Sequence, residues 1–308
     1  MKQPLTSSGL VTLGAELLFA AVALAPLPFG STPPTAIASW SVVLGVSIIL
    51  SSNAAVALRP GQLAFPGLAA IILSAYALVM YEQLAEHPLI PAQPNPVWQQ
   101  AEAALGVPLT PTVAIAHGEA WLALGRPLLC ILALMAGFLV GLKRERARRL
   151  IMIIAWSAVA YAIYGIVSHL FDPTHILWLE KNVYLDSVTA TFIGRNAAGA
   201  YFGGCAVIWS LLLWERIRLT SQRRPLEWRA TTSRLLSNPP RSVVIAFLML
   251  LLCLVAMFMT RSRAASLLSL LAIMIGFICL FRRDLPGRIG IVSTVIGGGM
   301  IALVSGTA

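Results

Sequence analysis

The stretch that decides the fold runs from Lys143 to Phe171 and reads KRERARRLIMIIAWSAVAYAIYGIVSHLF. A short run rich in arginine is followed, from Leu150 onward, by 22 residues without a single Asp, Glu, Lys or Arg. A helix needs about 20 apolar residues to cross roughly 30 Å of hydrocarbon. Because Lys and Arg accumulate on the cytoplasmic side of membranes, the stretch predicts a transmembrane helix that starts in the cytoplasm.

The composition of the whole chain agrees with this interpretation. Hydrophobic residues make up 58% of the 308 residues, and charged residues make up only 11%. The mean hydropathy is +0.83, which excludes an ordinary soluble domain. The net charge of +10 does not indicate a nucleic-acid-binding protein, because the basic residues lie beside the ends of apolar segments.

Nine apolar segments approach the length of a membrane span. They run from Leu10 to Pro28, Thr35 to Ser52, Gln62 to Tyr81, Ala120 to Leu142, Leu150 to Phe171, Asn196 to Trp214, Ser242 to Thr260, Ala264 to Phe281 and Ile289 to Gly306. Each should be a helix, since lipid offers no partner to unpaired backbone groups. We therefore expect an all-α integral membrane protein, with residues 1–308 forming a single polytopic membrane domain of about nine transmembrane helices.

The distribution of basic residues predicts the orientation. Of the 22 Lys and Arg residues, 17 fall in loops 143–149, 215–241 and 282–288 or at Lys2 and Arg59, all on one side. That side should be the cytoplasm, which puts the N-terminus inside and the C-terminus in the periplasm. Loops 82–119 and 172–195 then lie outside. The first is rich in proline, and we expect at most one short helix there, near Val97 to Leu105.

The first apolar segment allows a second interpretation. It could be a signal peptide cleaved after Ala36-Ile37-Ala38, but its length and the polar Glu16 favour a retained helix. The downstream topology is the same in both cases.

Five basic residues break the pattern and map to the outer half: Arg126, Lys181, Arg195, Arg261 and Arg263. Arg261 and Arg263 lie in a short turn between two helices, and Arg195 lies at the mouth of another helix. Guanidinium groups bind phosphate in a bidentate manner and are weakly hydrated, so three of them at one level suit an anionic lipid headgroup. The alternative is that these arginines only snorkel to the interface.

The remaining candidate groups give weaker signals. Arg126 lies a few residues inside its helix, where a structural ion pair with Glu16 or Glu119 is one interpretation and substrate binding is another. Among the histidines, only His175 has a nearby acidic residue at a telling spacing, Asp172. The four cysteines and the histidines show no metal-binding spacing, so we expect no metal and no cofactor.

Two stretches resemble a known family. The run from Ile176 to Tyr201, ILWLEKNVYLDSVTATFIGRNAAGAY, is similar to the signature of the bacterial O-antigen ligase and polysaccharide polymerase superfamily, in which a strip such as Thr-Gly-Thr-Phe leads into Arg-Asn at a helix start. Thr260-Arg261-Ser262-Arg263-Ala264-Ala265 resembles the second marker, a Ser-Arg-Gly or Ser-Arg-Ala turn. The resemblance extends from Pro108 to the end of the sequence.

The resemblance implies a metal-independent, inverting glycosyl transfer at the periplasmic face of the bacterial inner membrane. The donor would be a glycan on undecaprenyl pyrophosphate, and the acceptor a lipid or a growing glycan. Arg195 and Arg263 would hold the pyrophosphate and stabilise the leaving group. Asn196, Arg261 and Lys181 would contribute to substrate binding.

The sequence departs from the family in one respect. Members usually continue into a large periplasmic loop with a catalytic histidine, whereas this sequence stops at Ala308. Three interpretations stay open: a truncated or split product, recruitment of His175 or His117 as the base, or a partner chain that supplies the missing loop. Two other functions also remain, a transporter of lipid-linked oligosaccharides and a non-catalytic subunit of a polysaccharide complex.

Overall fold

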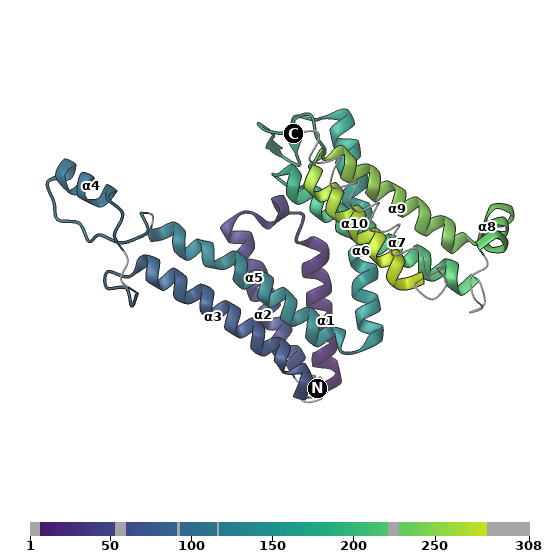
Figure 1. Ribbon diagram of the computed structural model, residues 1–308, viewed down its shortest axis with the longest axis horizontal. Coiled ribbons are helices and arrows are strands. Elements are labelled where there is room, and N and C mark those ends of the chain that lie inside the picture. The colour runs from purple at the N-terminus through teal and green to yellow at the C-terminus, as the bar shows by residue number, and fades with distance from the viewer. Residues whose placement is uncertain (1–6, 53–59, 91–92, 116, 221–227, 282–308) are drawn as a thin grey trace, which may run out of the picture. The chain divides into compact units, whose positions relative to one another are not determined.

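We describe a computed structural model of the chain over residues 7–52, 60–90, 93–115, 117–220 and 228–281 (Figure 1). Within these ranges nearly every ordered element is a helix. The α-helices are α1 (Ser7–Leu24), α2 (Pro34–Ser51), α3 (Ala64–Leu84), α4 (Val97–Leu105), α5 (His117–Gly141), α6 (Arg144–Phe171), α7 (Arg195–Thr220), α8 (Trp228–Ser237), α9 (Arg241–Met259) and α10 (Arg263–Phe281). Two short 3₁₀ helices, Phe29–Ser31 and Pro60–Gln62, and a hairpin of β1 (His175–Ile176) and β2 (Leu179–Glu180) complete the set.

The chain is an all-α, multi-pass membrane protein. In the part that the structure describes, seven helices are long and apolar enough to cross a bilayer: α2, α3, α5, α6, α7, α9 and α10. In α1 the apolar part is shorter, Gly9–Leu24. The predicted spans from Leu10 to Phe281 therefore all correspond to helices, and the ninth, Ile289 to Gly306, lies outside the described residues. The predicted short helix in the proline-rich loop is confirmed as α4.

Several helix ends differ from the sequence prediction. The first helix stops at Leu24 rather than at Pro28, because Pro26 has no N–H to donate and disfavours helical geometry in the preceding residue. The run 143–149, predicted as a cytoplasmic loop, is helical from Arg144 onward, where α6 begins. Likewise, the predicted loop 215–241 contains the end of α7 and all of α8. Basic residues are good helix formers and extend a helix beyond its apolar part.

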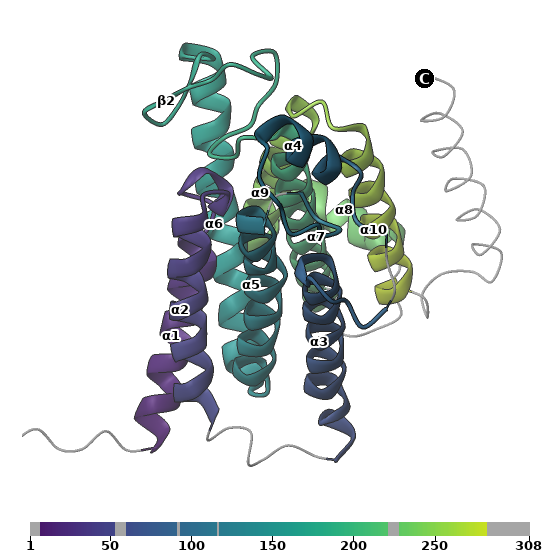
Figure 2. The same ribbon diagram turned by 90° about the vertical axis from the view of Figure 1, so that its left-hand side faces the viewer.

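The contacts divide the chain into two compact units. The first comprises residues 1–25 and 31–150, and the second comprises residues 26–30 and 151–308. In the first unit α2 packs against α1 and α5, and α3 packs against α5; Figure 2 shows α1 and α2 side by side. Gly14 allows the close approach of α2, because a Cβ there would lie 2.4 Å from Ser51 Oγ. The Ser47 hydroxyl donates to the Gly14 carbonyl across 2.6 Å.

An ion pair joins the beginning of α6 to α1 within the first unit. The Arg149 guanidinium contacts both carboxylate oxygens of Glu16, at 2.6 and 3.1 Å, and it also lies over the Phe19 ring. Glu16 is therefore the partner of Arg149, and its predicted pairing with Arg126 is wrong. The sequence could not show this, because the two residues are 133 positions apart.

The second unit is organised around α7, which packs against both α9 and α10 (Figure 1). Small residues on α7 allow this packing. A Cβ at Gly203 would lie 1.9 Å from Ser269 Oγ in α10, so the two helices can be this close only with glycine there. On another side of α7, the Trp209 indole donates to the Ala155 carbonyl of α6 across 3.1 Å.

Candidate functional site at the N-terminal ends of α7 and α10

A buried strip of non-helical chain, Ser187–Phe192, leads into α7. All six of its residues are at most 9% exposed, and Val188 donates its backbone N–H to the Met259 carbonyl at the end of α9 across 2.9 Å. The glycine of α6 at position 165 lets the strip approach, because a Cβ there would lie 2.8 Å from Ala190 Cβ. The strip thereby fixes the loop before α7 against the turn between α9 and α10.

The two sequence markers meet at the start of these helices. The Ser262 hydroxyl donates to the Asn196 side-chain oxygen across 3.0 Å. Gly199, one turn further along α7, lies against the same turn, since a Cβ there would be 2.8 Å from Thr260 Oγ1 and 2.9 Å from Ser262 Cβ. We call the group of Arg195, Asn196, Arg261, Ser262 and Arg263 the arginine site. The two marker segments thus lie against each other in the structure.

Arg261 is tied to the loop that precedes α7. Its guanidinium forms an ion pair with Asp186 at 2.5 Å, and both side chains are more than half exposed. The backbone of Arg261 has a φ of 55°, in the left-handed region that costs a non-glycine residue about 1–2 kcal/mol. Strain of this kind is often found at functional sites. Arg261 therefore holds the loop and the turn together.

Arg195 and Arg263 begin the two helices. The Arg195 guanidinium lies over the Tyr184 ring, 5.2 Å from its centre, a cation–π contact that orients the side chain. Arg263 is an exposed first residue of α10. The N-terminal end of a helix carries partial positive charge and free N–H groups, so both arginines add to helix ends that already favour anions.

Lys181 is buried beneath this surface. It is 7% exposed, and its ammonium group donates to the Ser187 carbonyl across 2.9 Å. Burial lowers the pKa of Lys181, and the nearby carboxylate of Asp186 opposes that shift. This residue thus stabilises the fold of the loop, and its ammonium is not displayed on the surface.

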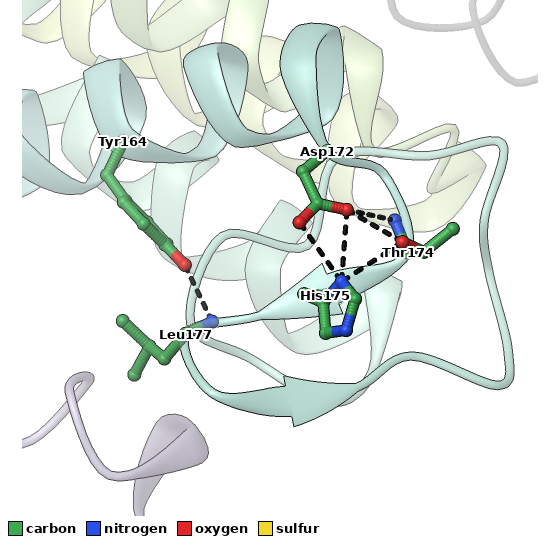
Figure 3. Close-up of polar contacts among 5 residues, drawn as sticks. All are labelled: Tyr164, Asp172, Thr174, His175 and Leu177. Atoms are coloured by element: carbon green, nitrogen blue, oxygen red, sulfur yellow. Dashed lines mark hydrogen bonds and ion pairs between the residues drawn. The ribbon is translucent and has the colours of Figure 1, made fainter.

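His175 of β1 contacts Asp172, the residue that directly follows α6 (Figure 3). Nδ1 of His175 lies 3.0 Å from Oδ2 of Asp172, and Thr174 donates its hydroxyl to the same carboxylate across 2.7 Å. The hydrogen bonds from Thr174 and His175 lower the pKa of Asp172. The Leu177 N–H donates to the Tyr164 hydroxyl across 2.8 Å and fixes the hairpin to α6. The sequence spacing of His175 and Asp172 indicated that the two side chains pair, and in the structure they are in contact.

Sequence reasoning missed three residues near the arginine site. Asp186 and Tyr184 contact the arginines, and His169 lies within electrostatic reach of Lys181, Arg261 and Asp186. Nδ1 of His169 is shielded from solvent and has no hydrogen-bond partner among the residues that the structure describes. An acidic residue and an aromatic residue between Lys181 and Arg195 were a usable signal, whereas nothing in the sequence distinguishes His169.

The other predicted residues belong to other parts of the chain. Arg126 belongs to the first unit, whereas the residues of the arginine site belong to the second. His117 begins α5, and its side chain lies outside the described residues. Over the described ranges, no group of three or more His, Cys, Asp or Glu side chains is placed to hold a metal ion. Cys205 and Cys253 are buried in the core of the second unit, and neither forms a disulfide.

Comparison with protein-family models, with curated proteins and with solved structures gives no match for this chain. The arrangement of residues at the arginine site is therefore the basis for assigning a function.

Proposed function

We propose that this protein transfers or polymerises a glycan carried on undecaprenyl pyrophosphate at the periplasmic face of the bacterial inner membrane. The observation that carries the proposal is the junction between Asn196 and Ser262, which joins the two arginine-bearing segments at adjoining helix ends. The resemblance of both segments to the O-antigen ligase and polymerase superfamily supports the same assignment.

The charge distribution supports the orientation that this function requires. Arg144 to Arg149 begin α6, and Arg216, Arg218 and Arg234 lie at or beyond the far end of α7. By the positive-inside rule these ends face the cytoplasm. The opposite ends of α6 and α7, with the arginine site, then face the periplasm, where lipid-linked glycans are joined to their acceptors. In this proposal the N-terminus is cytoplasmic and the C-terminus periplasmic.

The arginine site suits the leaving group of such a reaction. An acceptor hydroxyl attacks the anomeric carbon, the bond to the pyrophosphate oxygen breaks, and negative charge grows on the departing lipid pyrophosphate. Arg195 and Arg263 stabilise that charge together with the N-terminal ends of α7 and α10. Arg261 is already paired with Asp186, so we assign it a positioning role. Asn196, held by Ser262, orients the donor.

A base must accept the proton of the acceptor hydroxyl. His175 is the described histidine with the right chemistry, because Asp172 can accept from Nδ1–H and leave Nε2 as the acceptor. The tautomer follows from this hydrogen bond. Asp172 in turn is held by Thr174. The sequence left three candidates for the general base: His175, His117 or a residue of a partner chain. In this proposal the base is His175.

The proposal can be tested in a bacterial strain from which the gene for this chain has been deleted. Polymer length and undecaprenyl-linked intermediates are measured after complementation with the unaltered chain, Arg195→Ala, Arg263→Ala or Arg241→Ala. The last variant removes an exposed arginine at the start of α9, away from the site. We expect the first two variants to insert normally but to accumulate lipid-linked glycan, and Arg241→Ala to restore the polymer.

The same experiment separates transfer from transport. If the chain transfers glycan, the accumulated lipid-linked intermediate is accessible to a probe added at the outer face of the membrane. If the chain is instead a transporter, its inactive variants should leave the lipid-linked intermediate confined to the inner face of the membrane. Normal complementation by both Arg195→Ala and Arg263→Ala would contradict the proposed role of the arginine site.

A further inference from the structure

The first unit contains a cavity with a single charged residue on its wall. The cavity has a volume of about 470 Å³ and is lined by Thr32, Pro34, Ile37, Tyr76, Ala123, Arg126 and Pro127. These residues come from the start of α2 and the chain just before it, from α3 and from α5. We propose that this cavity binds the phosphate group of a membrane lipid through Arg126. The inference does not rest on the proposed function, because all of its residues belong to the first unit.

The position of Arg126 requires a counter-charge. It is the tenth residue of α5 (His117–Gly141) and lies among apolar residues of that helix. An arginine in such a position is costly unless it is paired. Glu16 is engaged by Arg149, and the side chain of Glu119, the other predicted partner, lies outside the described residues. Among the described residues Arg126 has no hydrogen-bond or ion-pair partner. In this proposal the phosphate of a lipid at the outer end of α5 supplies that charge.

The other lining groups fit the polar part of a lipid. Tyr76 of α3 also lines the cavity and carries an aromatic hydroxyl that can donate a hydrogen bond. Pro127 has no N–H, so the Ala123 carbonyl lacks its usual helical donor, and both residues line the cavity. A cation, a hydroxyl and a free carbonyl together match a phosphate next to a hydrogen-bond donor, as in a glycerol or ethanolamine headgroup.

The size of the cavity is also adequate. Binding pockets for small ligands usually have volumes of about 300–1,000 Å³, so this cavity admits a headgroup while the acyl chains stay in the bilayer. Simple snorkelling of Arg126 into water would need no such cavity. It would also give no preference for one lipid over another.

The test uses the full chain, purified in detergent. Thermal unfolding and lipid retention in native mass spectrometry are measured with dioleoyl phosphatidylglycerol, with dioleoylglycerol, which has the same chains but no phosphate, and with inorganic phosphate alone. We expect phosphatidylglycerol to be retained and to raise the unfolding midpoint, and the other two additives to have no effect. An equal response to inorganic phosphate would assign the site to free phosphate and overturn the lipid assignment.

Two variants of Arg126 make the test specific. Arg126→Gln should weaken phosphatidylglycerol retention about ten- to hundredfold, the loss typical of a charge-assisted hydrogen bond. Arg126→Lys keeps the charge without the planar fork and should retain an intermediate amount. Arg241→Gln, which removes an exposed arginine from another helix end, should behave like the unaltered chain. If Arg126→Gln does not fold, the Arg126→Lys result decides, and unchanged retention in either variant overturns the proposal.

Discussion

The hydroxyl of Ser262 donates a hydrogen bond to the side-chain oxygen of Asn196 across 3.0 Å, and this bond joins the start of α10 to the start of α7. Both residues stand beside arginines that the sequence separates by more than 60 positions. Ser262 is 3% exposed, whereas Asn196 is exposed, so the bond is partly buried. The arrangement of the arginine site depends on it.

Removing this bond should destabilise the protein. We expect Ser262→Ala to lower the free energy of unfolding by about 0.5–1.5 kcal/mol, the net contribution of one hydrogen bond. Asn196→Ala should cost a similar amount, and the double variant should be little worse than either single variant, since both remove the same interaction. Denaturant unfolding in detergent measures all three. Strictly additive losses would mean that the two side chains do not interact.

The left-handed backbone of Arg261 gives a second prediction. At a φ of 55° glycine is free of the strain that any side chain suffers, so Arg261→Gly should be more stable than Arg261→Ala by about 1 kcal/mol. Arg263, in the first turn of α10, is the matched control, because glycine in a helix is less stable than alanine there. The order of thermal unfolding midpoints should therefore reverse between the two positions. The same order at both would contradict the conformation of the turn.

The packing of α7 on α10 predicts a sharp contrast between neighbouring glycines. Gly203→Ala should destabilise the protein by about 1–3 kcal/mol, because the new methyl group would lie 2.8 Å from Ser269 Cβ. At Gly204 nothing lies within 4 Å, so Gly204→Ala should be neutral or stabilising. Ser269→Gly, combined with Gly203→Ala, should restore most of the loss. Equal effects at both glycines would rule out this helix contact.

Lys181 predicts a dependence of stability on pH. Its pKa in the folded protein lies below the ordinary value of 10.5, so between these two values the unfolded chain binds more protons than the folded one. Stability should therefore rise as the pH increases through this window, because the buried ammonium no longer has to be kept charged. Lys181→Met should flatten the rise in unfolding midpoint that the unaltered chain shows as the pH increases toward 10.5. An identical pH profile for both proteins would show that folding does not bury the charged ammonium of Lys181.

The pair of Asp172 and His175 predicts an effect on turnover without loss of folding. Asp172→Asn should lower glycan transfer by about 10²-fold or more, as expected when a general base loses the group that orients it. Both side chains are about half exposed, so the unfolding midpoint should change little. Thr174→Val, which removes only the hydrogen bond to Asp172, should have a smaller effect. Full activity of Asp172→Asn would exclude His175 as the base.

The sequence predicts the helices well because their physical signal is local. Apolar length and flanking arginines locate α6, and the turn residues around Val97–Leu105 locate α4. Helix ends are harder to predict from apolar length. The helix α1 ends at Leu24 because of a proline two residues later, although the apolar run continues. The hairpin of β1 and β2 has only two residues in each strand, too few for a periodic pattern.

The candidate site is predictable only in part. The residue types of the two markers indicate Arg195, Asn196, Arg261 and Arg263, but not how they are held. The pairing of Arg261 with Asp186 joins positions 75 residues apart, so only the fold determines it. The burial of Lys181 was likewise unexpected, because a lysine between polar residues normally indicates a surface.

The measurement that tests the central claim most directly is glycan transfer by the purified chain from an undecaprenyl-pyrophosphate-linked oligosaccharide, followed by the release of undecaprenyl pyrophosphate. We predict that the unaltered chain and Arg241→Ala release the lipid at similar rates. Arg195→Ala and Arg263→Ala should each be slower by about 10²-fold or more, because each removes charge stabilisation from the leaving group. Release by these two variants at the rate of the unaltered chain, with all proteins folded, would contradict the account.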